Sequence, residues 1–238
     1  MKPIVVTCLL GIASLASCQD REKSALGDAR ATAAAANVRA DLERDLTAAG
    51  LHFGDPVFIR AFKEEKQLEL FVRNRASGKF ELFRIYPIAA ASGVAGPKLV
   101  EGDGQVPEGF YHVPPAAMNP TSRYHLAFNI GYPNEFDRAH QRTGSAIMVH
   151  GNNVSIGCLA MTDAKIEEIY TLCAAAHQGG QAYLRVHLFP FRMTSARLEE
   201  TAGNPNHAFW QNLAEGYDHF EKNQIPPDVT VRKGRYQF

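Results

Sequence analysis

The spacing of apolar residues predicts a domain built mostly of β-strands. From residue 51 onward, short segments place apolar residues at alternate positions, which is typical of strands with one buried face. The first three expected strands follow one another with short polar turns between them, which predicts an antiparallel meander. The expected strands cover 56–62, 67–73, 79–88, 106–113, 123–130, 147–149, 181–190 and 229–238.

Helical spacing is confined to a few segments. Apolar residues between Ile166 and Cys173 share one face of a helix expected from about Ala164 to His177, which Gly179 and Gly180 end. Two further helices are expected over 193–201 and 207–223, whereas the polar and aromatic segment 131–140 is expected to be a loop. Together these segments predict an α+β fold that is mainly β.

The N-terminus has the pattern of an export signal. Lys2 precedes an apolar run from Ile4 to Ala16, which Leu15-Ala16-Ser17-Cys18 closes. That tetrapeptide resembles the bacterial lipobox, in which Cys18 becomes the lipidated first residue of the mature protein. The alternative is ordinary cleavage near Ser17. Both interpretations predict a periplasmic location in the cell envelope, and lipidation adds a membrane anchor.

The segment that follows is rich in Ala, Arg, Asp and Glu, which favours a helix. Its apolar face is mostly Ala with Leu42 and Leu46, so we expect a tether rather than a core element. The chain then divides into a signal (1–18), a helical tether (19–50), a globular domain (51–192) and a C-terminal helical extension packed on that domain (193–238).

Composition narrows the class of protein. The 238 residues are 45% hydrophobic and 21% charged with a formal net charge of +0, which suits one well-cored domain with appendages. The sequence has no block of Lys and Arg, so we expect no nucleic-acid partner. Outside the signal, the cysteines are Cys158 and Cys173. A disulfide between them is conceivable, but the helical position of Cys173 favours a buried free thiol. Cys and His residues do not occur at the spacing of a metal site, so we expect neither a metal nor a cofactor.

One stretch concentrates the candidate chemistry. The apolar run 147–149 predicts a buried strand that ends at His150, and small, turn-forming residues lead from there to Cys158, 8 positions later. The attacking species of a cysteine nucleophile is the thiolate, and His150 can accept the thiol proton. We expect Ser155 to orient the imidazole, and the N–H groups of Gly157 and Cys158 to form an oxyanion hole. These are the parts of a cysteine acyl-transfer site.

The motifs around this pair resemble a known family. His150-Gly151 followed by Ser155-Ile156-Gly157-Cys158 resembles the signature of the L,D-transpeptidase (YkuD) catalytic domain, and 106–111 resembles a second motif of that domain. The match is best with its YafK-like subgroup. The motifs that carry this resemblance are 62–65, 107–111, 129–134, 136–140, 148–151, 154–158, 189–194 and 216–218.

The resemblance implies a fold and a reaction. The fold is a YkuD-like β-sandwich or barrel, with a helix after the catalytic Cys and helices at the C-terminus. The reaction forms a thioester of Cys158 with a diaminopimelate-containing stem peptide of peptidoglycan and passes the acyl group to an amine acceptor. One alternative is an amidase that hydrolyses a cross-link or the bond between diaminopimelate and a peptidoglycan-linked lipoprotein. A second alternative is an inactive peptidoglycan-binding lipoprotein.

The sequence also departs from the family pattern. The interval from His to Cys is short, Ile156 stands where the family has His, and 159–161 lack the Arg or Asn expected after the Cys. For the carboxylates of the substrate we expect Arg123, Arg138 and Lys98, since Arg forms bidentate pairs with them; the alternative for each is a solvated surface cation. The other expected substrate-binding residues are Tyr132, Asn134, His140 and Gly151, and the alternative for His140 is a structural role.

Overall fold

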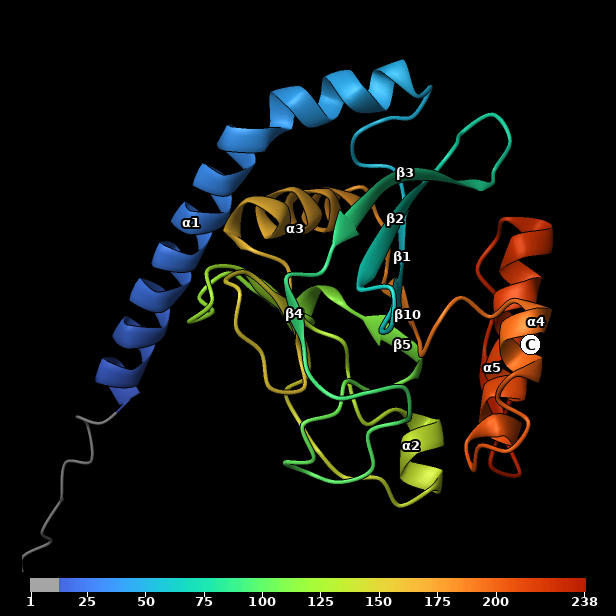
Figure 1. Cartoon of the computed structure of the whole chain (residues 1–238). Coiled ribbons are helices and arrows are strands. Elements are labelled where there is room, and N and C mark those ends of the chain that lie inside the picture. The colour runs from blue at the N-terminus through green and yellow to red at the C-terminus, as the bar shows by residue number, and fades with distance from the viewer. Residues whose placement is uncertain (1–12) are drawn as a thin grey trace, which may run out of the picture.

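The computed structural model of the chain describes residues 13–238, with side chains from residue 29 onward (Figure 1). Most of the apolar run of the expected signal therefore lies outside the described residues. No helix among the described residues is long and apolar enough to span a membrane.

The first sheet has five strands in the order β3-β2-β1-β10-β5. The antiparallel meander expected from the sequence is confirmed, because β2 pairs antiparallel with both β1 and β3. The distant strand β10 lies parallel to β1 and antiparallel to β5. The five strands are β1 (Val57–Phe62), β2 (Gln67–Arg73), β3 (Phe80–Pro87), β5 (Gly109–Val113) and β10 (Leu184–Phe189).

The second sheet consists of very short strands in the order β4-β9-β8-β7-β6. Neither of the five-stranded sheets closes on itself, so the fold is α+β as expected, but the barrel alternative is wrong. A separate hairpin of β11 (Thr230–Arg232) and β12 (Arg235–Gln237) ends the chain. The strands of the second sheet are β4 (Ala90–Ala91), β6 (Met118–Asn119), β7 (Ala127–Asn129), β8 (Met148–His150) and β9 (Leu159–Ala160).

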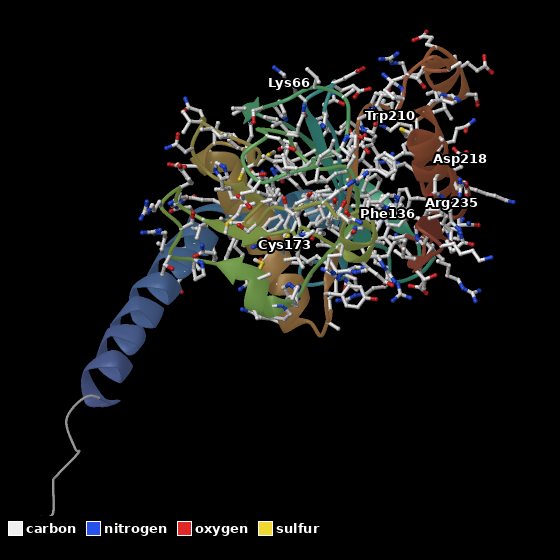
Figure 2. All side chains as sticks on the ribbon, turned by 90° about the horizontal axis from the view of Figure 1, so that it is seen from below. Lys66, Phe136, Cys173, Trp210, Asp218 and Arg235 are labelled. Atoms are coloured by element: carbon white, nitrogen blue, oxygen red, sulfur yellow. The ribbon has the colours of Figure 1, made fainter. Side chains whose placement is uncertain are left out.

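Helices cover both faces of the first sheet. Along β1 the side chains of Ile59 and Ala61 join a core cluster that includes residues of α3 (Asp163–Gln178) and of the second sheet. The alternate residue Phe62 faces the opposite way, into an aromatic cluster with α5 (His207–Asn223). Figure 1 shows α3 and α5 on opposite sides of β1 and β10, and Figure 2 shows Trp210 on the inner side of α5. The short elements are η1 (Pro115–Ala117), α2 (Glu135–Ala139) and α4 (Ser195–Glu199).

The segment 131–140 is not a simple loop, because residues 135–139 form α2. The Asn134 side chain accepts the Asp137 N–H, and the Asp137 carboxylate accepts the Asn134 N–H, which makes a capping box. Asp137 is fully buried and also binds Arg142 and Tyr111. The expectation of a loop was wrong because it gave the aromatic residues more weight than the capping signal.

The N-terminal helix α1 (Ala13–Ala48) is more than a tether. Leu42 and Leu46 are buried in the main core, and α1 lies beside α3 (Figure 1). Arg84 of β3 binds Asp45 of α1 at 2.6 Å and Glu168 of α3, so ion pairs reinforce the contact. The expectation that this segment stays out of the core is wrong for its C-terminal part, because a few Leu and Ala residues are enough where the partner helix presents a matching apolar face.

The packing of α1 gives a stability prediction. We expect Leu46→Ala to lower the free energy of unfolding by about 3 kcal/mol, since it removes fully buried methyl groups and leaves a cavity. Leu82→Ala is the matched control, because Leu82 is 47% exposed and should change stability by no more than about 0.5 kcal/mol. Urea unfolding of both variants measures the difference. Equal, small effects would show that α1 does not pack on the domain.

Candidate active site

His150 and Cys158 come together because β8 and β9 are parallel neighbours. The register pairs Val149 with Leu159 and His150 with Ala160. Cys158, one residue before β9, therefore lies beside Met148, and the alternation of side chains puts it on the same face of the sheet as His150. Both residues line one cavity of about 250 Å³. The loop between β6 and β7 supplies a further part of the cavity wall, including Arg123 and Tyr124.

The Cys158 thiol is held by the backbone of the neighbouring strand. Its Sγ accepts the Met148 N–H at 3.4 Å and donates to the Ala146 carbonyl at 3.7 Å. Burial raises the pKa of the Cys158 thiol above its ordinary value, while the Met148 N–H and the charge of Lys98 oppose that rise. The thiol is therefore protonated at neutral pH and needs a base.

The His150 imidazole is placed to be that base. Its side chain is buried, and Nδ1 lies 2.6 Å from the Gly151 carbonyl oxygen. Because a carbonyl only accepts, Nδ1 carries the proton and Nε2 has the free lone pair. Burial lowers the pKa of His150 below its ordinary value, against a smaller opposing effect of the Gly151 carbonyl. The imidazole is therefore neutral and able to take a proton at neutral pH.

Gly151 has a structural reason to be glycine. A Cβ there would lie 2.6 Å from Asp163 Oδ1 and 2.7 Å from the backbone oxygen of Tyr124. The absence of a side chain thus lets α3 and the β6–β7 loop close around the residue whose carbonyl orients His150. The structure thus gives Gly151 an orienting position beside His150, and a substrate contact of Gly151 stays a prediction.

Ser155 does not orient the imidazole as expected. Its hydroxyl accepts the Cys158 N–H at 2.9 Å and donates to the Cys158 carbonyl at 2.7 Å. It therefore fixes the backbone of the nucleophile. The sequence placed Ser155 correctly in the site, but the assignment of its partner required the loop conformation.

The expected oxyanion donors are both engaged. The Cys158 N–H donates to Ser155, and the Gly157 N–H donates to Ser92 Oγ at 2.6 Å. Gly157 has φ of +83°, which favours glycine. These N–H groups therefore do not form an open oxyanion hole here. Ser92 lies in the irregular segment after β4, and no pattern in the sequence marked it.

Arg123 is the one expected carboxylate ligand that reaches the cavity. Its side chain is exposed, and among the described residues it makes no ion pair. Lys98 does not play that part: its Nζ is buried and binds Asp103 at 2.7 Å and the Val100 carbonyl at 2.9 Å. Its charge acts on the Cys158 thiol only from a distance.

The structure does not bring the remaining expected substrate ligands to this cavity. Tyr132 is buried and donates to the Lys98 carbonyl at 3.1 Å, and Asn134 caps α2 and donates to the Phe110 carbonyl. Arg138 donates to the Pro133 carbonyl, and His140 stacks on Phe136 with 4.1 Å between ring centroids. All four stabilise the region around α2, and none of them lines this cavity.

Tyr124 belongs to the site although the sequence did not single it out. Its ring centroid lies 4.7 Å from that of His150, with the rings tilted by 31°. The sequence placed Tyr124 inside a strand over 123–130, but β7 begins only at Ala127. The charge of the neighbouring Arg123 marked it as a candidate carboxylate ligand. An aromatic residue in an expected strand, in contrast, is usually interpreted as part of the hydrophobic core.

A cysteine and a histidine that line one cavity are the arrangement that a cysteine acyl-transfer site requires, and comparison with known proteins gives the family of the domain. The model of the L,D-transpeptidase catalytic domain, YkuD, matches residues 56–187, more than half of the chain. The chain belongs to this family of cysteine L,D-transpeptidase domains.

Curated relatives lie in the same family. The chain is 44% identical over 183 residues to the "Putative L,D-transpeptidase YafK" of Escherichia coli (strain K12), across 77% of this chain and 74% of that protein. The protein of the same name from Escherichia coli O157:H7 matches equally. The resemblance to the YafK-like subgroup is thereby confirmed.

Solved structures of cell-shape proteins also align. The helical cell shape determining protein Pgp2 of Campylobacter jejuni aligns with a TM-score of 0.46 and 19% identity, over 76% of this chain and 74% of that chain. Its K307A mutant aligns with a TM-score of 0.46 and 21% identity, and this chain spans only 57% of that chain's length.

The pKa directions predict how Cys158 reacts with pH. A protonated thiol beside a neutral imidazole should be alkylated by iodoacetamide at a rate that keeps rising through pH 9.0, the ordinary thiol pKa, because the thiolate forms only above it. Turnover should fall only at a pH below 6.5, the ordinary imidazole pKa, because burial lowers the pKa of His150 and the imidazole keeps its free lone pair to a lower pH. Mass spectrometry of the Cys158 peptide measures the first profile. A plateau of alkylation near pH 7 would instead indicate a thiolate–imidazolium pair.

Proposed function

We propose that this protein is an exported enzyme of peptidoglycan that acts by cysteine acyl transfer, of the L,D-transpeptidase type. The single observation that supports this most is the placement of Cys158 and His150 on one sheet face, lining one cavity, with the imidazole oriented by the Gly151 carbonyl. Membership of the family supplies the substrate class, the stem peptide of peptidoglycan.

The proposed first half-reaction follows from the protonation states. His150 Nε2 takes the thiol proton as Cys158 Sγ attacks the carbonyl carbon of diaminopimelate. The carbon–nitrogen bond then breaks, and the imidazolium gives the proton to the leaving amine. The product is a thioester on Cys158. Negative charge develops on the carbonyl oxygen during this step. To stabilise it, the Gly157 N–H would have to leave Ser92, or the Cys158 N–H would have to leave Ser155, and donate to that oxygen instead.

In the second half-reaction an amine attacks the thioester and releases Cys158, which forms a cross-link or exchanges the terminal residue. We propose that Arg123 binds a free carboxylate of the stem peptide at the cavity, since its guanidinium is unpaired among the described residues and matches carboxylate geometry. The neutral His150 again serves as the base, now for the attacking amine.

The N-terminal sequence is the basis for the proposed cellular location. We infer export to the periplasm and attachment to a membrane through a lipid on Cys18, from the lipobox-like Leu15-Ala16-Ser17-Cys18 alone. Such an anchor would keep the enzyme at the envelope, where its substrate lies.

Hydrolysis is the second candidate. The same thioester could be released by water, which would make the protein an amidase of a cross-link or of a lipoprotein–diaminopimelate bond. The observation that favours it is the loop before Cys158, where Ile156 is 84% exposed at the position at which the family signature has His. An apolar tip there supplies no polar contact for an acceptor amine.

Loss of the nucleophile tests the proposed class. We expect Cys158→Ala to abolish turnover of purified stem peptides, by at least about a thousandfold, because Cys173, the other cysteine whose side chain the structure describes, is fully buried. A carbapenem should add its mass to wild type but not to this variant. Cys173→Ala is the matched control and should keep full activity. A folded wild type that neither turns over peptide nor takes up the carbapenem, yet still binds sacculi, would indicate the inactive binding protein.

A second measurement separates transfer from hydrolysis. Cross-linked sacculi are incubated with the protein and a labelled D-amino acid, and the products are read by mass spectrometry. We expect the label in the stem peptide, since an amine acceptor captures the thioester. Release of free peptide or protein without label would contradict transfer and establish the amidase.

A further inference from the structure

Helix α1 contacts the wall of the catalytic cavity. Arg123 and Tyr124 lie in the loop between β6 and β7, and Arg30 of α1 binds the backbone on both sides of them. A single nitrogen, Arg30 Nη1, donates to the Ser122 and His125 carbonyl oxygens, each at 2.8 Å. The guanidinium thus closes a bridge across the two residues that face the cavity.

The loop depends on such support. Residues 120–126 belong to no strand, and His125 has φ of +67°, a conformation that a non-glycine residue keeps only when its surroundings hold it. The His125 imidazole lies 2.8 Å from Glu167 of α3, and the other oxygen of Glu167 accepts from Asn37 of α1 at 3.2 Å. Loop, α1 and α3 therefore form one connected polar contact.

The same loop sets the surroundings of the catalytic base. The Tyr124 ring packs on His150, and the Tyr124 carbonyl lies against Gly151, whose own carbonyl binds His150 Nδ1. A displacement of the loop would move Arg123, the Tyr124 ring and the support of Gly151 together.

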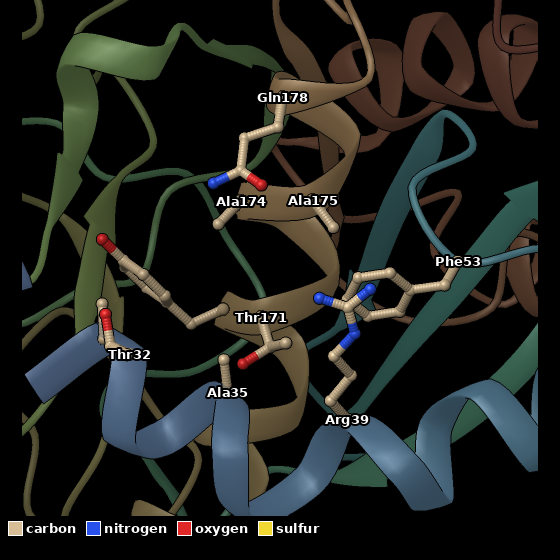
Figure 3. Close-up of a pocket in the computed structure, with 10 residues that line it drawn as sticks. Thr32, Ala35, Arg39, Phe53, Thr171, Ala174, Ala175 and Gln178 are labelled. Carbon is tan, nitrogen blue, oxygen red and sulfur yellow. The ribbon is translucent and has the colours of Figure 1, made fainter.

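Helix α1 packs on α3 through buried residues such as Ala34, and a cavity lies beside this contact. The cavity has a volume of about 280 Å³ and is lined by residues of both helices, and Figure 3 shows Ala35 and Thr171 on its opposite walls with Arg39 over the Phe53 ring. The close contacts of α1 include the buried residues Ala34, Leu42 and Leu46, and Arg30 is the α1 side chain that binds the backbone of the β6–β7 loop.

We propose that Arg30 is a positioning residue for the catalytic cavity, through which the docking of α1 fixes Arg123 and Tyr124 beside Cys158 and His150. Helix α1, which the sequence predicted to be a tether, would then take part in organising the catalytic cavity. The effect of Arg30 on turnover rests on the proposed function, whereas its effect on the reactivity of Cys158 does not.

The test compares two alkylating agents on the full chain. Iodoacetate is an anion and iodoacetamide is neutral, so the ratio of their rates at Cys158 reports a cation held at the cavity, which is Arg123. We expect Arg30→Ala to lower this ratio by roughly threefold to tenfold at low salt, because Arg123 is no longer held. Arg30→Lys should largely restore it, since an ammonium can also donate to both carbonyls.

A matched control and a double variant make the test specific. Arg44 lies on the same helix but binds only Asp41 and Asp45 within α1, so Arg44→Ala should leave the ratio unchanged. Arg123→Ala should lower the ratio by itself, and adding Arg30→Ala should lower it no further. An unchanged ratio in Arg30→Ala would overturn the proposal. So would an additive loss in the double variant, because Arg30 would then act as a distant charge.

Turnover gives a separate result. In wild type and Arg44→Ala, kcat/KM for stem peptides should be equal, and in Arg30→Ala it should fall roughly tenfold, since small displacements of positioned groups slow catalysis. A lowered alkylation ratio together with a wild type that turns over no peptide would support the positioning role and overturn the proposed function.

Discussion

The parallel pairing of β8 with β9 is the constraint on which the site depends. Hydrogen bonds between these two very short strands place Cys158 beside Met148 and on the same face as His150. The strands are only three and two residues long, so their position depends on β4 and β7 on either side and on the core beneath them. Loss of this register by one residue would turn the thiol to the opposite face.

Around that pairing, backbone groups and hydroxyls replace the charged partners that many cysteine sites use. The thiol is held by the Met148 N–H and the Ala146 carbonyl, and the imidazole by the Gly151 carbonyl. Burial then dominates the pKa of both groups, raising that of Cys158 and lowering that of His150. The result is a neutral pair of thiol and imidazole.

The body of the protein holds this site from two sides. On one face of the first sheet, α1 and α3 support the loop that carries Arg123 and Tyr124. On the other, Trp210 of α5 donates to Glu108, which also accepts from Lys63 and from the Gly96 N–H. Glu108 is fully buried, and these bonds satisfy its charge. They anchor the segment that carries Ser92, whose hydroxyl accepts the Gly157 N–H beside Cys158.

The sequence by itself determined the local features: the meander, α3, α5, and the candidates His150 and Cys158, because these follow from periodicity, capping and residue chemistry within one segment. It could not determine which partners distant segments supply. Ser155 binds the Cys158 backbone rather than the imidazole, Tyr132 and Asn134 support α2, and Leu42 and Leu46 enter the core. Only the tertiary structure decided these, because a hydrogen bond or a buried face depends on which segments meet in space.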